Sequence, residues 1–257
     1  MSRKPFNKDL AILLANLVVE AYQHVDNYNV SQYNLELVSK LNNKETDIQG
    51  FIAKDNNNLY IAFRGANTSK DYLRDVDVLY KNYPPSRRFF FKPKVHKGFF
   101  DGYLSVKSEI VNAVTSNSTI DSIRITGHSM GAALAVYCAF DLKRDLNLDD
   151  EKITLYTYGC PEVGNGSFIK KFKKSVKTSY RVVNDEDIVA KINLPGFAHV
   201  PTLALIKGTE IIVNPDTLLR VKEAIDDPIA VITGEAIRDH LSRNYVKALQ
   251  EVTKITD

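Results

Sequence analysis

Apolar residues follow a helical period in some stretches of the chain and a strand period in others. The predicted helices cover residues 7 or 8 to 24, 32–41 (the weakest), 101–116, 132–142, 167–176, 216–224 and 234–252. The predicted strands cover residues 48–54, 59–64, 123–126, 153–158, 180–183, 204–206 and 210–213. Strands alternate with helices through the middle of the chain, whereas turn signals join 48–54 to 59–64 and 204–206 to 210–213 as hairpins. This order predicts an α/β fold with a mostly parallel central sheet, helices on both faces and antiparallel hairpins at its margins.

The pattern contains no internal repeat and no low-complexity linker, so we predict one domain over residues 1–257. Residues 66–93 are the least regular stretch. They contain Pro84 and Pro85, followed by an Arg-Arg-Phe-Phe-Phe-Lys cluster at 87–92. We expect residues 89–91 to form a partly buried strand, with contact to lipid as the alternative.

Composition narrows the class of protein. The net charge is +3, from 34 basic and 31 acidic residues, which is too small to indicate nucleic-acid binding. No stretch approaches the length of a transmembrane helix. The N-terminal apolar run contains Asp9 and Asn16 and lacks a small-residue cleavage site, which favours an amphipathic helix over a signal peptide. Cys138 and Cys160 lie in apolar surroundings without metal-binding spacing, so we expect two free thiols and a cytoplasmic location, with a single disulfide as the alternative.

Residues 127–131 read Gly-His-Ser-Met-Gly and match the pattern G-x-S-x-G. A strand pattern precedes them, and a helix pattern rich in alanine follows, which is the setting of a nucleophile elbow. A serine hydroxyl is a weak nucleophile and must be held clear of the backbone beside a base, which such a turn achieves. The N-terminal N–H groups of the following helix would point toward a developing oxyanion. We therefore predict that Ser129 is a nucleophile, and the alternative is an ordinary glycine-rich turn.

A serine nucleophile needs a histidine base, and the chain has five histidines. Elbow-type hydrolases carry their catalytic residues in the order serine, acid, histidine. His240 fits this order and is the predicted base, with His199 as the alternative. His96 precedes the serine, His24 ends the first predicted helix, and His128 adjoins the serine, where a packing or hydrogen-bonding role is expected.

The acid is expected where the strand at 180–183 ends, because the carboxyl ends of parallel strands line the ligand-binding edge of such a sheet. Asp185, Glu186 and Asp187 follow that strand. We predict Asp187, with Asp185 as the alternative.

An oxyanion hole needs two backbone N–H groups, one from the residue after the nucleophile, Met130, and one from a loop after an earlier strand. The strand at 59–64 ends in Gly65, and Ala66 would supply the second N–H.

These segments together resemble the class 3 lipases, an α/β-hydrolase group that includes the filamentous-fungal triacylglycerol lipases. The similar segments occur in family order over about residues 10–250: Phe63-Arg64-Gly65 (F-R-G), residues 95–99 (V-H-x-G-F), 127–131 (G-H-S-[LM]-G), 157–164 (T-x-G-x-P-R-V-G, with Glu162 at the arginine), 181–190 (R-V-x-N-x-x-D-x-V-P, with Ala190 at the proline), 196–200 (G-[FY]-x-H) and His240 with Tyr245 (H-x-x-x-x-Y).

The resemblance implies an α/β-hydrolase fold with Ser129, Asp187 and His240 as triad and the N–H groups of Ala66 and Met130 as oxyanion hole. The family commonly has serine or threonine at the position of Ala66, so this chain lacks that hydroxyl. The implied function is hydrolysis of carboxylic esters of lipids, as a triacylglycerol lipase or esterase, through an acyl-enzyme and without cofactor or metal. The open alternatives are an acyltransferase, a phospholipase A1-type activity on the same triad, and a non-catalytic lipid-binding protein.

The resemblance also implies a lid over the serine, in the segment after F-R-G. In this chain that segment is residues 67 to about 80, where Tyr72, Leu73, Val76 and Leu79 form an apolar stripe of about two turns. So short a stripe predicts a small lid, transient contact with a lipid interface, and activity on dissolved short-chain esters. The alternative is a fixed surface helix.

Overall fold

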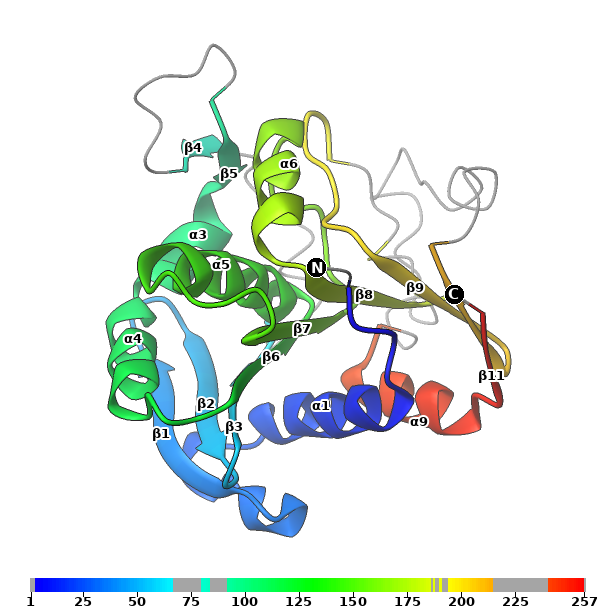
Figure 1. Ribbon diagram of the computed structural model, residues 1–257, viewed down its shortest axis with the longest axis horizontal. Helices are drawn as coiled ribbons and strands as arrows, with labels where there is room; N and C mark the ends of the chain where they lie inside the picture. Colours follow the sequence, from blue (N-terminus) through cyan, green and yellow to red (C-terminus); the bar gives the residue numbers. More distant parts are fainter. Residues whose placement is uncertain are drawn as a thin grey trace.

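One twisted sheet runs through the molecule between two layers of helices (Figure 1). The computed structural model describes residues 3–66, 80–83, 92–185, 187, 190, 194–214 and 240–256. The strands of this sheet are, in spatial order, β1 (Glu36–Asn43), β2 (Ile48–Lys54), β3 (Asn58–Phe63), β6 (Ser122–His128), β7 (Ile153–Tyr158), β8 (Thr178–Asn184), β9 (Leu203–Lys207), β10 (Glu210–Val213) and β11 (Lys254–Thr256). Strands β3, β6, β7, β8 and β9 are parallel, whereas β1, β2 and β3 pair antiparallel, as do β9 and β10. The predicted mostly parallel sheet with antiparallel margins is confirmed.

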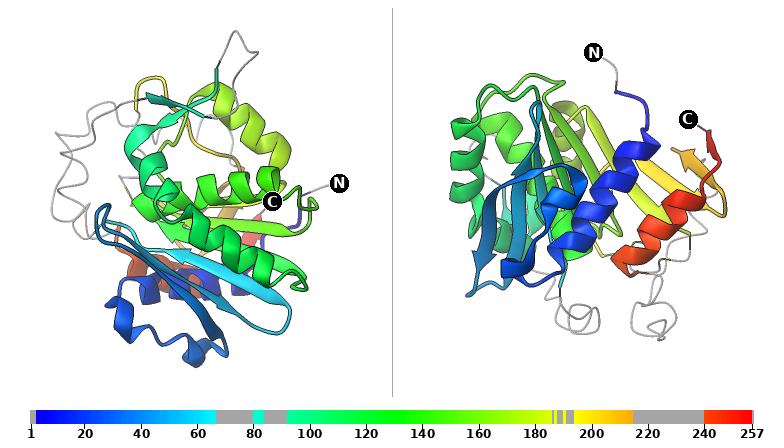
Figure 2. Two further views of the ribbon diagram at one scale, coloured as in Figure 1. Left: turned by 90° about the vertical axis from the view of Figure 1, so that its left-hand side faces the viewer. Right: turned by 90° about the horizontal axis from the view of Figure 1, so that it is seen from below.

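Helices cover both faces of this sheet, as the sequence predicts. Helices α1 (Lys8–Ala21) and α9 (Ser242–Glu251) lie side by side on one face (Figure 2). The other face carries α3 (Lys97–Leu104), α4 (Lys107–Ser116), α5 (Met130–Asp145) and α6 (Gly166–Ser175). Two short 3₁₀ helices, η1 (Val25–Asn27) and η2 (Val30–Tyr33), follow α1, and β4 (Tyr80–Asn82) pairs antiparallel with β5 (Lys94–His96) outside the large sheet.

Strand β3 shows why the central strands consist of continuous runs of apolar residues. Leu59, Ile61 and Phe63 belong to the core beneath α5, whereas Tyr60 and Ala62 belong to the core beneath α1. Side chains alternate between the two faces of a strand, so a sheet covered on both faces needs apolar residues at every position. All five side chains are buried.

The predicted helix at 32–41 is wrong. Residue Asn34 adopts a left-handed conformation with φ 58° and ends η2, and the chain then forms strand β1. Strand β1 pairs with β2 over its whole length, from Glu36 opposite Lys54 to Asn43 opposite Ile48. Backbone groups of β2 supply these hydrogen bonds, and local propensity contains no information about such a partner.

The predicted helix at 101–116 is two helices, α3 and α4, with a break at Ser105 and Val106. The Ser105 hydroxyl donates to the Gly102 carbonyl at 2.7 Å, so the side chain satisfies a carbonyl of the last turn.

Strands β4, β5 and β11 were not predicted. Residues 67–79, 89–91, 216–224 and 234–239, which carry the predicted lid, the aromatic strand and parts of the last two helices, lie outside the described residues.

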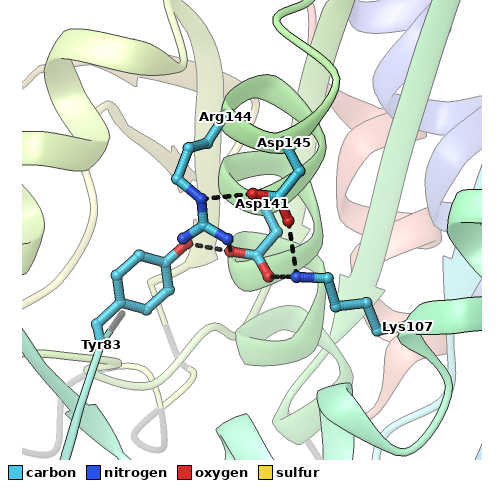
Figure 3. Close-up of polar contacts among 5 residues, drawn as sticks. All are labelled: Tyr83, Lys107, Asp141, Arg144 and Asp145. Carbon is cyan, nitrogen blue, oxygen red and sulfur yellow. Dashed lines mark hydrogen bonds and ion pairs between the residues drawn. The ribbon is translucent and has the colours of Figure 1, made fainter. Parts of the chain in front are cut away.

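A network of charges around the buried Asp141 fastens α4 and α5 to the residue after β4 (Figure 3). Asp141 of α5 accepts hydrogen bonds from the Tyr83 hydroxyl and the Lys107 ammonium, and Arg144 lies 3.0 Å from the same carboxylate. Asp145 accepts from Lys107 at 2.8 Å and from Arg144 at 2.6 Å. Two carboxylates thus meet two permanent cations, and the charges balance.

Two further observations bear on the sequence predictions. Cys138 and Cys160 are both buried, free thiols. Burial raises the pKa of the Cys160 thiol to about 12, so it stays protonated. The cytoplasmic location stays a prediction. Among the described residues, no helix combines the length and the hydropathy that crossing a membrane requires.

Candidate active site

Ser129 occupies the sharp turn between β6 and α5. Its backbone has φ 56° and ψ −126°, in a region that residues other than glycine rarely adopt. A Cβ built on Gly127 would lie 2.2 Å from the carbonyl oxygen of Gly131, so only glycine allows the strand and the helix to approach this closely. The predicted strand–turn–helix geometry is therefore present, with the serine at the start of the helix.

Asp187 and His240 form a buried pair. His240 Nδ1 lies 2.9 Å from Asp187 Oδ2 and 3.0 Å from Oδ1, and both side chains are almost inaccessible to solvent, at 2% and 0% exposure. Since a carboxylate only accepts, Nδ1 carries the proton, and Nε2 of the neutral ring is left unprotonated. Of the two carboxylates considered from the sequence, Asp187 is the one on His240.

Burial alone would raise the pKa of Asp187, but its partners reverse this effect. Its interactions with His240, together with the hydrogen bond from the Tyr245 hydroxyl, hold the pKa of the carboxyl below its ordinary value. The Tyr245 hydroxyl donates to Oδ2. Tyr245 itself is fully buried in α9, five residues after His240. Asp187 is therefore ionised at neutral pH and held in place from two sides.

The serine and the Asp187–His240 pair come from neighbouring strand ends. Ser129 follows β6, and its N–H donates to the Tyr158 carbonyl at the end of β7 at 3.0 Å. Asp187 follows β8. No hydrogen bond joins Ser129 to His240, and within the described ranges the buried His240 Nε2 has no partner. A general base often lacks its catalytic hydrogen bond in the absence of substrate, so this arrangement is compatible with the predicted role of His240.

The stretch that ends at Ala66 packs against the elbow. A Cβ built on Gly65 would lie 2.8 Å from the His128 carbonyl and 3.2 Å from Ser129 Cβ. Met130 is the first residue of α5. Ala66 and Met130 are therefore close neighbours of Ser129 in space and in sequence, respectively. The Arg64 guanidinium holds this stretch through Gln49 at 2.5 Å and the Asp47 carboxylate at 2.9 Å.

The other histidines have different partners. His96 caps the N-terminus of α3 and stacks on Phe99, and burial lowers its pKa to about 4. Burial also holds the pKa of His199 well below its ordinary value, with Arg181 adding to the effect. His24 is exposed and caps η1 rather than ending α1, which corrects the sequence interpretation. His240 is thus the histidine that lies on Asp187.

Sequence analysis missed the contact of two tyrosines with the site. Tyr245 belongs to the H-x-x-x-x-Y segment, but the sequence predicted no role for it. Tyr22, at the end of α1, lies 2.7 Å from His128 Nδ1 and had no signal apart from the helix pattern. Within the described ranges, no three side chains of histidine, cysteine, aspartate or glutamate gather as a metal site.

Comparison with known families agrees with this geometry. The family model described as Lipase (class 3) matches residues 60–197, which include the elbow, the acid and most of the parallel strands. The chain belongs to the class 3 lipase family. This confirms the resemblance inferred from the sequence, and with it the α/β-hydrolase fold.

Individual relatives are similar over half of this chain or more. A lipase from Rhizomucor miehei is 32% identical over 195 residues, covering 72% of this chain and 51% of the relative. A chloroplastic phospholipase A(1) from Arabidopsis thaliana is 31% identical over 147 residues, covering 51% of this chain and 33% of the relative. Among solved structures, a triacylglycerol lipase described as having a serine protease triad superposes with a TM-score of 0.70 at 26% identity, covering 78% of this chain and 80% of that one.

The chain spans about half the length of the curated relatives it matches.

Proposed function

We propose that this class 3 lipase is a serine hydrolase that cleaves carboxylic esters of lipids, as a triacylglycerol lipase or esterase. The observation that carries the proposal is the buried Asp187–His240 pair at the strand ends beside the strained Ser129. The related lipase of Rhizomucor miehei and the triad of the similar triacylglycerol lipase support the same conclusion.

The geometry supports a two-stage reaction. Ser129 Oγ attacks the ester carbonyl while His240 Nε2 takes its proton, and Asp187 stabilises the imidazolium that forms. The backbone N–H groups of Ala66 and Met130 hold the oxyanion of the tetrahedral intermediate. His240 then protonates the leaving alcohol, which departs. Water, activated by His240, attacks the acyl-enzyme and releases the fatty acid.

A second candidate is phospholipase A1-type activity on the same triad. The observation in its favour is the similarity to the Arabidopsis thaliana phospholipase A(1), over about half of this chain. The chemistry would be identical, and only the glycerol substituent beside the cleaved ester would differ. Acyl transfer also shares the acyl-enzyme, which an alcohol would attack in place of water.

The test is an assay of purified chain on p-nitrophenyl esters of increasing acyl length, tributyrin and phosphatidylcholine vesicles. We expect hydrolysis that Ser129→Ala abolishes, whereas Ser122→Ala, at the other end of β6, keeps full activity. Preferred cleavage of phosphatidylcholine would favour the second candidate, and ester products formed with added alcohol would indicate acyl transfer. Binding of lipid without any turnover by the wild type would contradict the proposal.

Lipid contact is tested by following the rate on tributyrin through its solubility limit. We propose a small lid and therefore expect activity below the limit and at most a modest rise above it. A rate that rises sharply only beyond the limit would contradict this part of the proposal.

A further inference from the structure

The hydroxyl of Tyr22 contacts two different parts of the site. Its oxygen lies 2.7 Å from His128 Nδ1. Burial raises the pKa of the Tyr22 hydroxyl, and a hydrogen bond with the backbone of Gly65 partly offsets this rise, so the Gly65 N–H is the donor. A Cβ built on Gly65 would lie only 2.3 Å from the same oxygen. Tyr22 thus joins α1 to the stretch that carries Ala66.

His128 continues this chain of contacts to the base. Its Nε2 lies 2.5 Å from the backbone oxygen of His240, and the two imidazole rings are 4.5 Å apart between centroids. A carbonyl oxygen only accepts, so Nε2 of His128 carries the proton. Nδ1 of that neutral tautomer is unprotonated and accepts from the Tyr22 hydroxyl. The donors therefore run in one direction, from Gly65 through Tyr22 and His128 to the carbonyl of His240.

The neutral state of His128 suits its position. Burial, reinforced by the neighbouring His240, lowers the pKa of His128 to about 3. In the proposed mechanism His240 becomes a cation, and a second imidazolium at this separation would oppose that charge. A neutral ring can hold the backbone of His240 without such a cost.

We propose that Tyr22 and His128 are positioning residues. Through this directed chain of hydrogen bonds they fix the position of the stretch that carries Ala66 relative to His240. The inference rests on the proposed ester hydrolysis. The oxyanion and the imidazolium form in the same step, so Ala66 and His240 must be correctly placed at the same moment. Both residues would act through the residues that they hold.

Tyr22→Phe removes only the hydroxyl from this chain of contacts. We expect kcat on p-nitrophenyl butyrate to fall about 3- to 10-fold, the effect of one neutral hydrogen bond, with little change in KM. Tyr28→Phe is the matched control, since the buried Tyr28 hydroxyl, six residues along, has no partner in the part of the chain that the structure describes. Equal kcat for Tyr22→Phe and Tyr28→Phe would overturn the proposal.

His128→Gln tests whether the two residues act together. The glutamine amide can still donate to the His240 carbonyl but offers the Tyr22 hydroxyl no nitrogen in the position of Nδ1. We expect His128→Gln to lower kcat and Tyr22→Phe to have little further effect in that background. Fully additive losses would show two independent contacts and overturn the directed chain.

Nitrogen NMR of the histidine rings gives a readout that does not depend on turnover. We expect His128 in the Nε2–H tautomer between about pH 5 and 8. Tyr22→Phe should shift its Nδ1 resonance, and Tyr28→Phe should not. A protonated ring or an Nδ1–H tautomer would overturn the inference. If the wild type cleaves no ester, the proposed function fails, whereas an active wild type with an unaffected Tyr22→Phe variant refutes this inference alone.

Discussion

Two buried aspartates of this chain have similar surroundings and different partners. Asp187 and Asp141 are 0% and 1% exposed, and each accepts a hydrogen bond from a tyrosine, Tyr245 and Tyr83, respectively. Asp141 also meets two permanent cations (Figure 3), whereas Asp187 meets a histidine.

The partner decides what each carboxylate can do. Lys107 and Arg144 are permanent cations that balance the charges of Asp141 and Asp145, so this network fastens α4 to α5. Asp187 lies on an imidazole and would stabilise the cation that His240 becomes in the proposed reaction. Asp141 also lies about 18 Å along α5 from Ser129, too far for any direct role in the chemistry. Burial of a carboxylate is therefore no indication of catalysis until its partner is known.

The largest expected difference is between Asp187→Asn and Asp141→Asn. We expect Asp187→Asn to lower kcat by roughly 10³-fold or more, because an asparagine fixes the wrong tautomer of His240 and cannot stabilise its charge. Asp141→Asn should leave kcat within about 3-fold, since it lies outside the site. Steady-state kinetics on a soluble ester measure both. The assignment of Asp187 is wrong if its variant is active while Asp185→Asn is inactive.

Asp141→Asn should instead lower the free energy of unfolding by about 2–3 kcal/mol, because Lys107 and Arg144 lose the buried one of the two carboxylates that they share. These two cations are 24% and 29% exposed, which makes the loss smaller than for a fully buried pair. Urea unfolding monitored by circular dichroism measures the change. An unchanged midpoint would mean that the network contributes nothing to stability.

The next effect is on the pH dependence of stability, which should differ between the region around His240 and the Asp141 network. The pKa of His128 is lowered from 6.5 to about 3. Between these values the unfolded chain binds a proton that the folded chain does not, so stability falls as the pH falls. By linkage, His128 should cost about 2 kcal/mol of folding free energy on going from pH 7 to 5.

The stability that the Asp141 network contributes should not change between pH 7 and 5. Arg144 and Lys107 outweigh burial and hold the pKa of Asp145 below 3.8, so its contribution is lost only at lower pH. His128→Gln should therefore show a shallower loss of stability between pH 7 and 5 than the wild type, in urea unfolding at each pH. An Asp141→Asn variant should keep the wild-type slope. Parallel curves for His128→Gln and the wild type would contradict the neutral state of His128.

The two tyrosines provide a smaller test. Tyr245→Phe removes a hydrogen bond to Asp187 and should lower kcat about 10-fold, as expected for a hydrogen bond to a charged group. Tyr83→Phe removes the matching bond to Asp141 and should cost about 1–2 kcal/mol of stability with kcat unchanged. The comparison fails if both variants lose activity equally.

The smallest effect is expected at Ala66. Ala66→Ser restores the hydroxyl that the family commonly has, and kcat on short esters should stay the same or rise by a few fold. A large loss in a variant that remains folded would mean that the second oxyanion donor lies elsewhere.

Local sequence was sufficient for the elements that depend on local chemistry. The alternation of apolar residues predicted the central strands, and Gly127 and Gly131 around Ser129 predicted the sharp turn, because both signals depend on residues that are neighbours in sequence. The order of serine, acid and histidine, together with the family motifs, predicted Asp187 and His240 as partners, which the structure brings within hydrogen-bonding distance.

Tertiary structure alone decided which distant groups meet. Residues 32–41 contain a pattern compatible with a helix, but Glu36–Asn43 forms strand β1 because β2 offers its backbone groups. Asp141 becomes part of a balanced network only because Lys107 and Tyr83 arrive from other elements. Tyr22 meets Gly65 and His128 because α1 packs beneath the sheet at this point. A period or a motif describes the neighbours of a residue along the chain, whereas these partners are chosen by long-range packing, which local sequence does not encode.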